Sequence, residues 1–177
     1  MAYIKGIFLE DIYKNESNGY TVGLIRIKET DTEDMNGKVV TFTGIFDDLK
    51  YKQVYKMTGE FVNHPKYGKQ FKTDTYEIVM PTDTEELIEF LSSDLFPIGE
   101  KTAEKIVDRL GTDAINKIID DPNVLVGIPR LSDKKILKIV EVLNDYQSTS
   151  KILMSLNKLG FSTKDSLLIL KKFGSIT

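Results

Sequence analysis

The sequence of 177 residues contains no cysteine and only one histidine, His64. Without cysteine, disulfides and thiolate metal sites are excluded, and one histidine cannot form a multi-histidine metal site within a single chain. No apolar run approaches the length that spans a bilayer, and the first residues lack the apolar stretch of a signal peptide. These absences predict a cytoplasmic protein with no membrane partner.

The sequence also lacks recognisable catalytic motifs. The sequence has no Gly-x-x-x-x-Gly-Lys-Ser/Thr phosphate loop, no cysteine nucleophile and no second histidine. The adjacent acids at positions 85–86 and 120–121 would point to different faces of a helix, so we interpret them as helix-start or surface charge rather than metal ligands. We therefore expect this segment to be non-catalytic, with no cofactor of its own.

The net charge of −3 conceals a pattern along the chain. Residues 50–72 carry six lysines against one acid, a local charge of +5. Residues 81–129 hold four basic and eleven acidic residues, or −7, and residues 130–177 hold nine basic and four acidic residues, or +5. Because phosphates respond to charges within about 8–10 Å, the local sign matters more than the total. The two basic stretches are therefore candidate DNA contacts.

The first 81 residues are predicted to form a β-domain. Five runs with strand-like alternation occur at residues 3–10, 20–28, 39–46, 54–62 and 70–79. Glycines within or beside these runs, at positions 6, 23, 44 and 59, are typical of bulges and of the bends that barrel closure requires. A five-stranded OB-fold barrel is the leading interpretation, and an SH3-like barrel is the main alternative.

After Pro81 the apolar period changes from two to about 3.6, which predicts an all-α domain over residues 82–177. Short amphipathic helices are expected at residues 82–91, 102–110, 113–119, 133–143, 151–159 and 164–173. Gly111, Gly160 and Gly174 stand where helix C-caps are expected. The predicted fold class is therefore α+β, with an OB-like barrel followed by a helical domain.

Three segments of the helical half repeat one shape, an apolar residue and a tight turn that opens a helix. They centre on Gly99, Arg130 and Gly160, and each resembles a helix-hairpin-helix element, whose glycine turn presents backbone N–H groups to a phosphate. The departures are Pro97 for the first glycine of copy one, Arg130 and Ser132 for both glycines of copy two, and Ser162 for the second of copy three. Plain helix packing is the alternative interpretation. The candidate DNA contacts are Arg130, Lys134, Lys135, Gly160 and Lys164, followed by Gly99 and Lys101 in the acidic segment.

The barrel supplies a second candidate contact, the hairpin over residues 59–71, which interleaves lysines with aromatic residues. Rings that stack on bases and ammonium groups that neutralise phosphates suit single-stranded DNA. Lys66, Tyr67 and Lys69 are the residues predicted to make these contacts. Phe61 and Phe71 are expected in the core, and His64 before Pro65 is interpreted as a turn residue.

The string Asn63-His64-Pro65-Lys66-Tyr67-Gly68-Lys69-Gln70-Phe71 resembles the N-terminal barrel of bacterial RecD-like ATP-dependent DNA helicases, and residues 98–107 resemble that family's helical region. The resemblance implies a longer parent whose motor domains use ATP and magnesium to unwind DNA in the 5′-to-3′ direction. It also implies roles in repair and replication. Because a further helix is expected after residue 177, we interpret the chain as part of such a protein.

The leading functional hypothesis is an accessory DNA-binding region that makes sequence-independent contacts with single-stranded or junction DNA. The alternative is an interaction module that docks the parent's own motor domains or another repair or replication protein, which the acidic segment favours. A nuclease or resolvase subunit is a third hypothesis, disfavoured by the lack of clustered carboxylates.

Overall fold

The computed structural model describes residues 1–173 and divides into two compact units. The barrel unit consists of Met1–Val79 together with Ser155–Thr177, and the helical unit consists of Met80–Met154. The division at Met80 lies one residue before the expected break at Pro81. The last helix groups with the strands, however, and not with the other helices.

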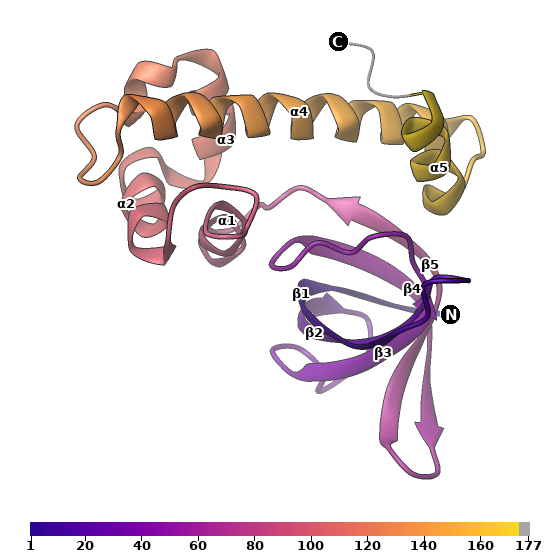
Figure 1. Cartoon of the computed structure of the whole chain (residues 1–177). Helices are drawn as coiled ribbons and strands as arrows, with labels where there is room; N and C mark the ends of the chain where they lie inside the picture. The colour runs from indigo at the N-terminus through magenta and orange to yellow at the C-terminus, as the bar shows by residue number, and fades with distance from the viewer. Residues whose placement is uncertain (174–177) are drawn as a thin grey trace. The chain divides into compact units, whose positions relative to one another are not determined.

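Five strands form the closed barrel. They are β1 (Ala2–Lys14), β2 (Tyr20–Thr30), β3 (Val39–Ile45), β4 (Val54–His64) and β5 (Gly68–Val79). Their order around the barrel is β1-β2-β3-β5-β4, so β1 pairs with both β2 and β4, while β3 and β5 close the barrel by a short parallel pairing (Figure 1). This arrangement confirms the prediction of an OB-like barrel.

Interior glycines allow the strands to cross closely. The β1–β2 register shifts between Lys5 and Gly6, and the β4–β5 register shifts between Thr58 and Gly59. A Cβ on Gly6 would collide with the carbonyl oxygen of Arg26, and one on Gly59 would collide with that of Lys72. Both positions therefore require glycine, as expected at the bulges that bend a small barrel.

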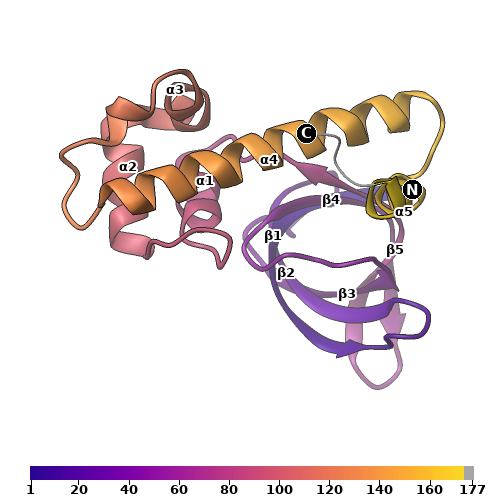
Figure 2. The ribbon, with the colours of Figure 1, turned by 45° about the horizontal axis from the view of Figure 1, so that its top comes forward.

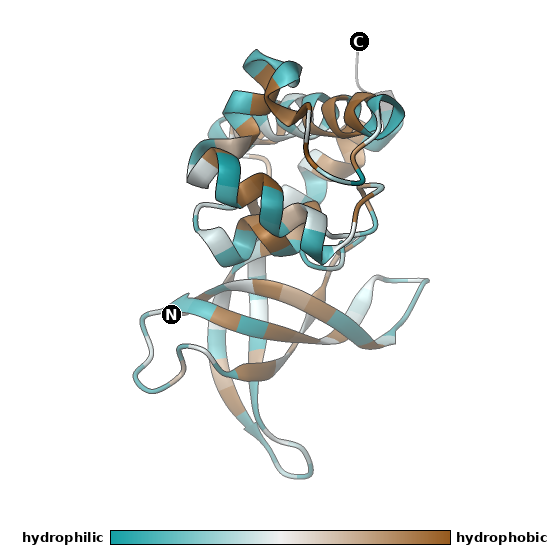
Figure 3. Ribbon diagram, turned by 90° about the vertical axis from the view of Figure 1, so that its left-hand side faces the viewer, coloured by the Kyte–Doolittle hydropathy of each residue, from teal (hydrophilic) through white to brown (hydrophobic). Residues whose placement is uncertain are grey.

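The barrel interior is rich in aromatic rings. Hydrophilic and hydrophobic residues alternate along parts of the strands (Figure 3). The hydrophobic residues that face the interior are buried. The rings of Phe42 and Phe46 lie 5.2 Å apart, and those of Phe46 and Tyr76 lie 4.8 Å apart. The packed cluster of buried residues consists of Ile4, Phe8, Ile25, Ile27, Met35, Phe42, Phe46, Tyr55, Met57, Phe71 and Tyr76.

The helical unit contains short helices followed by one long helix. They are α1 (Thr84–Leu91), α2 (Glu100–Leu110), α3 (Ala114–Asp120) and α4 (Asp133–Lys158), with the single turns η1 (Gly111–Asp113) and η2 (Pro122–Leu125). The end of α4, from Ser155 on, is counted with the barrel unit. The prediction of separate helices at 133–143 and 151–159 is wrong, because α4 is continuous over 26 residues. The polar stretch 147–150 contains neither glycine nor proline, so nothing in it interrupts the helical hydrogen bonds.

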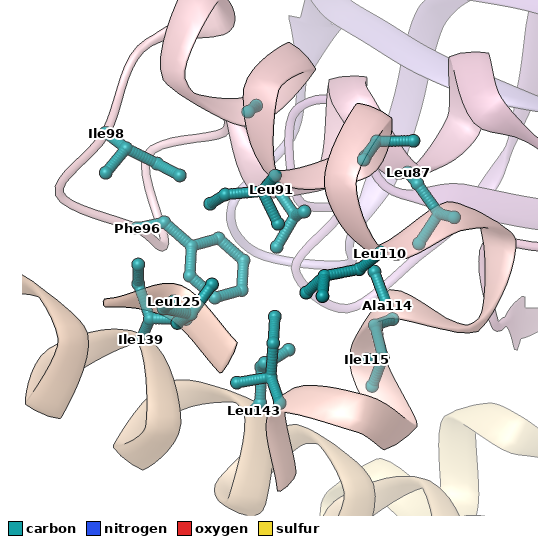
Figure 4. Packing of buried hydrophobic residues seen from close by; sticks show 14 of the residues in the cluster. Leu87, Leu91, Phe96, Ile98, Leu110, Ala114, Ile115, Leu125, Ile139 and Leu143 are labelled. Atoms are coloured by element: carbon teal, nitrogen blue, oxygen red, sulfur yellow. The ribbon is translucent and has the colours of Figure 1, made fainter. Parts of the chain in front are cut away.

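Apolar side chains from α1, α2, α3, η2 and α4 meet in one mainly aliphatic core. Leu87 and Leu91 of α1, Leu110 of α2, and Ile139 and Leu143 of α4 point toward one another around the ring of Phe96 (Figure 4). Phe90 also packs against the Tyr146 ring of α4, with ring centroids 4.8 Å apart. Tertiary packing therefore stabilises helices that are too short to be stable alone.

Helix ends follow the expected capping chemistry. Asp83 caps α1 by accepting the N–H of Glu86 at 2.8 Å, and Gly111, with φ of 77°, ends α2. The final helix, α5 (Thr163–Phe173), belongs to the barrel unit, where Leu167 packs against the barrel core. The expected cap at Gly174 lies outside the described residues. Within residues 1–173, none of the helices has the length and apolar character needed to traverse a bilayer.

Candidate nucleic-acid interface

The turn between β4 and β5 is built around His64. The Nδ1 of His64 accepts the backbone N–H groups of Lys66 at 3.1 Å and of Tyr67 at 3.2 Å, while Gly68 takes a φ of 77°. The rings of His64 and Tyr67 lie 4.8 Å apart, and the Nζ of Lys66 lies 5.3 Å from the Tyr67 ring centroid. The hairpin, which extends beyond the barrel body (Figure 2), thus presents two rings and a cation at its tip.

The three residues predicted at this hairpin do not form one patch. Lys66 and Tyr67 lie together at the tip, and Tyr67 is 65% exposed. Lys69 instead places its Nζ 4.9 Å from the ring centroid of Phe61, which packs on the buried Phe71. The next residue, Gln70, faces the hollow that Tyr67 lines, and consecutive strand residues point to opposite faces. Lys69 is therefore separated from the other two.

A hollow of about 350 Å³ lies on the barrel beside this tip. The rings of Tyr13 on β1 and Tyr20 on β2 lie 6.5 Å apart and form part of its wall, together with the hairpin residues His64 and Tyr67. The full lining is Ile12, Tyr13, Tyr20, Val22, Thr41, Thr43, His64, Tyr67 and Gln70. The faces of β2 and β3 and the turns after β1 and β4 are the surfaces that OB-folds use for oligonucleotides.

Sequence reasoning missed Tyr13 and Tyr20. Each lies outside the tight turn at Asn15–Gly19, and their contact depends on the pairing of Tyr13 with Val22 and Lys14 with Thr21. The sequence signal was a tyrosine close to each end of this five-residue turn. A short turn places the residues near its two ends on facing strands.

A second hollow of about 650 Å³ continues from the first within the barrel unit. The two share Tyr20, Thr43, His64 and Gln70. The second extends along β5 from Lys72 to Tyr76 and reaches Lys164 at the start of α5. Together the hollows form one surface groove, with an aromatic half and a polar half. We call this surface the barrel groove.

Gly160, one of the predicted contacts, has a capping role. With φ of 98°, it donates its N–H to Asn157 O at 3.1 Å, and Phe161 donates to Leu156 O at the same distance. This is the Schellman arrangement that closes a helix C-terminus. Ser162 then caps α5 by accepting the N–H of Asp165 at 3.1 Å. The third repeat therefore offers a ligand the side chain of Lys164 more readily than the Gly160 amide.

In the helical unit, the first two repeats meet at a hollow of about 610 Å³. Lys101 at the start of α2 lines it together with Arg130 and Lys135, and the Nζ of Lys135 donates to Arg130 O at 3.3 Å. Lys134 is not part of its lining. Residues from the −7 and +5 segments of the chain thus share one surface, which we call the helical hollow. Glu100 and Glu104 also line it and reduce its positive charge.

The start of α2 differs from the starts of the other two repeats. Its N-cap is Gly99, which has no side chain to accept a backbone N–H, and a Cβ there would meet no atom within 4 Å. In α4, by contrast, Ser132 Oγ accepts the N–H of Lys135 at 3.3 Å. The first turn of α2 therefore has N–H groups that no capping side chain occupies, a common anion-binding arrangement.

Few ionisable groups are perturbed near these surfaces. Burial raises the pKa of Tyr76, and the hydrogen bond from the Asp47 N–H at 3.2 Å lowers it by a smaller amount. Across residues 1–173, no three His, Asp or Glu side chains lie close enough together to hold a metal ion. The described surfaces offer rings, amides and cations to a ligand.

Comparison with known proteins agrees with this geometry. Residues 1–81 match the family model for the OB-fold domain of the ATP-dependent DNA helicase YrrC. Over its barrel, the chain therefore resembles a RecD-like DNA helicase. It is also 21% identical over 160 residues to the ATP-dependent RecD2 DNA helicase of Deinococcus radiodurans, covering 89% of this chain and 22% of that protein. The matched stretch is longer than the barrel and so includes helical residues. The chain thus spans about a fifth of the length of this relative.

Proposed function

We propose that this chain is an accessory DNA-binding region of a RecD-like ATP-dependent DNA helicase, and that its barrel groove binds single-stranded DNA. The observation that carries the proposal is the set of exposed rings around one hollow, where the pair Tyr13 and Tyr20 and the pair His64 and Tyr67 share the lining. Such rings stack on bases without regard to sequence, because every base has a π-face. Lys66, Lys72 and Lys164 supply nearby positive charge.

The helical hollow supplies a second contact in this proposal, to the phosphate backbone. The uncapped start of α2 and the three basic side chains Lys101, Arg130 and Lys135 suit a phosphate oxygen, as a helix-hairpin-helix element would. These contacts carry no base information, so single-stranded and junction DNA are both suitable ligands. ATP and magnesium would act in the motor domains of the longer protein, in repair or replication.

Binding of fluorescent oligothymidylate of about 16 nucleotides tests the groove. Changing Tyr13 and Tyr20 together to Ala should weaken binding at least tenfold, because stacking contributes about 1–3 kcal/mol per base. Tyr51→Ala is the matched control, since Tyr51 is 48% exposed beneath Lys52 but lines neither hollow of the groove. If the unchanged chain fails to bind at about 50 mM salt, the proposal is wrong.

A protein-docking role is the second candidate, and exposed apolar residues of the helical unit favour it. Leu137 is 72% exposed and Val126 is 57% exposed. Their partner in this case would be the parent's motor domains or another repair or replication protein. Changing both residues to Ser should then reduce the parent's unwinding rate while oligothymidylate binding by the segment stays unchanged, whereas equal unwinding would exclude this role.

A further inference from the structure

His64 is the single histidine of the chain, and its ring geometry defines which nitrogen carries the proton. Its Nδ1 accepts two backbone N–H groups, from Lys66 and Tyr67. A nitrogen that accepts an N–H holds no proton, so the neutral ring is protonated on Nε2. Because the turn occupies Nδ1, the Nε2–H is the ring group left to donate to a ligand.

The ring of His64 lies where a strand bound in the barrel groove would meet it. His64 is one of the four residues that line both hollows, so it stands where the aromatic half meets the polar half. Its ring also lies 4.8 Å from that of Tyr67, with the two planes 32° apart. A strand that occupies both hollows passes this ring pair.

We infer that His64 is a binding residue for single-stranded DNA: its ring extends the stacking surface of Tyr67, and its Nε2–H donates to a phosphate oxygen of the same strand. This inference rests on the proposed function of the barrel groove and adds a neutral donor to it. A neutral donor releases no counterion, so the His64 contact strengthens binding without adding to its salt dependence. Lys66, two residues away, adds to both the strength and the salt dependence of binding.

The variant His64→Asn separates this role from support of the turn. An Asn side-chain oxygen accepts N–H groups two or three residues on, as in an Asx turn, so the tip is kept while the ring and the Nε2–H are lost. We expect oligothymidylate binding to weaken about tenfold, while the slope of log affinity against log salt stays unchanged. Lys66→Gln, which removes a charge from the same turn, is the comparison variant. It should reduce the magnitude of that slope by about 0.7.

His64→Phe completes the set, because it keeps a ring but removes both nitrogens. It should bind more weakly than the unchanged chain, and backbone amide spectra of residues 63–69 will show whether the tip is preserved. If His64→Asn binds like the unchanged chain while the Tyr13 and Tyr20 double variant does not, the role of His64 is refuted and the groove stands. If no variant or unchanged chain binds, the proposed function itself fails.

Nitrogen-15 spectra of the His64 ring give a measurement that needs no variant. In the free protein, Nε2 should carry the proton and Nδ1 should not, and addition of oligothymidylate should shift the Nε2–H resonance. A proton on Nδ1 of the neutral His64 ring in the free protein would overturn the inference. So would an Nε2–H resonance that stays in place at saturating oligothymidylate.

Discussion

In the barrel unit the strands cross so closely at Gly6 and Gly59 that a Cβ would meet a carbonyl oxygen of the facing strand, whereas Gly99 and Gly111 in the helical unit face open space. At these two strand positions the barrel uses glycine to bring two backbones together, although at Gly68 and Gly160 it too uses glycine to turn the chain. The helical unit uses glycine to leave a helix end open or to turn the chain. Close backbone contact through glycine is thus a feature of the barrel strands.

The two units also differ in where they place aromatic rings and positive charge. The barrel fills its interior with rings and displays a further set, including Tyr13, Tyr20 and Tyr67, around its groove. The helical unit has a mainly aliphatic core, and its hollow combines backbone amides with basic side chains. In the proposed function, the barrel therefore contacts both bases and phosphates, whereas the helical unit contacts phosphates alone.

The largest expected effect on stability is that of Gly59→Ala in the barrel, compared with the same substitution at Gly99 of the helical unit. Gly59→Ala should destabilise the barrel by at least about 3 kcal/mol, because the new Cβ can be accommodated only if the backbone at Lys72 moves. Gly99→Ala should cost the helical unit less than about 1 kcal/mol, since its Cβ meets no neighbour and Ala is only a poorer N-cap.

Urea unfolding followed through the backbone amides of each unit measures both changes. The barrel amides of Gly59→Ala should lose protection at a lower urea concentration than those of the unchanged chain. Equal losses for Gly59→Ala and Gly99→Ala would break the distinction between the two uses of glycine.

The sequence predicted the local features of this fold well. Alternation and turn residues located all five strands, and the glycines at 6 and 59 mark bulges as expected. The prediction failed at α4, where polar residues 147–150 suggested a break. Packing of Tyr146 on Phe90 shows why the helix continues, because tertiary contacts favour helix where propensity alone is weak.

The candidate site was less predictable, because it depends on which distant residues meet. The separation of Lys69 from Tyr67 follows from the two faces of a strand, but only once the register of β5 is known. The meeting of Lys101 with Arg130 joins segments of opposite net charge, which a charge map along the chain treats as separate. Arg130, Lys135 and Lys101 therefore stay predicted contacts, now grouped on one surface.

Arg130 sharpens the comparison, because it has a φ of 65° where a helix-hairpin-helix turn would place glycine. Arg130→Gly should stabilise the helical unit by roughly 0.5–1 kcal/mol, since a side chain in this conformation is strained. It should also lower the magnitude of the salt-dependence slope of DNA binding by about 1, because one phosphate contact is lost.

Arg130→Ala is the matched control for this change. It removes the same charge but keeps a Cβ in the strained conformation, so the slope should fall equally while the stability of the helical unit stays near that of the unchanged chain. Urea midpoints and affinities between about 50 and 200 mM salt measure the two properties. Equal stabilities of the two variants would show that the positive φ carries no cost.

The smallest expected effect is an alkaline weakening of the barrel through Tyr76. Burial raises the pKa of Tyr76 in the folded barrel above 10.0, the ordinary value for a tyrosine. As the pH rises, the Tyr76 hydroxyl therefore ionises in the unfolded chain before it ionises in the folded barrel. The stability that the neutral hydroxyl contributes is thus complete below the ordinary pKa and is lost as the pH rises through the folded-state pKa. Tyr76→Phe cannot ionise, although it leaves the Asp47 N–H without this acceptor. The fall in the barrel's urea midpoint between about pH 9 and 11 should therefore be smaller in Tyr76→Phe than in the unchanged chain, and equal falls would place the alkaline sensitivity elsewhere.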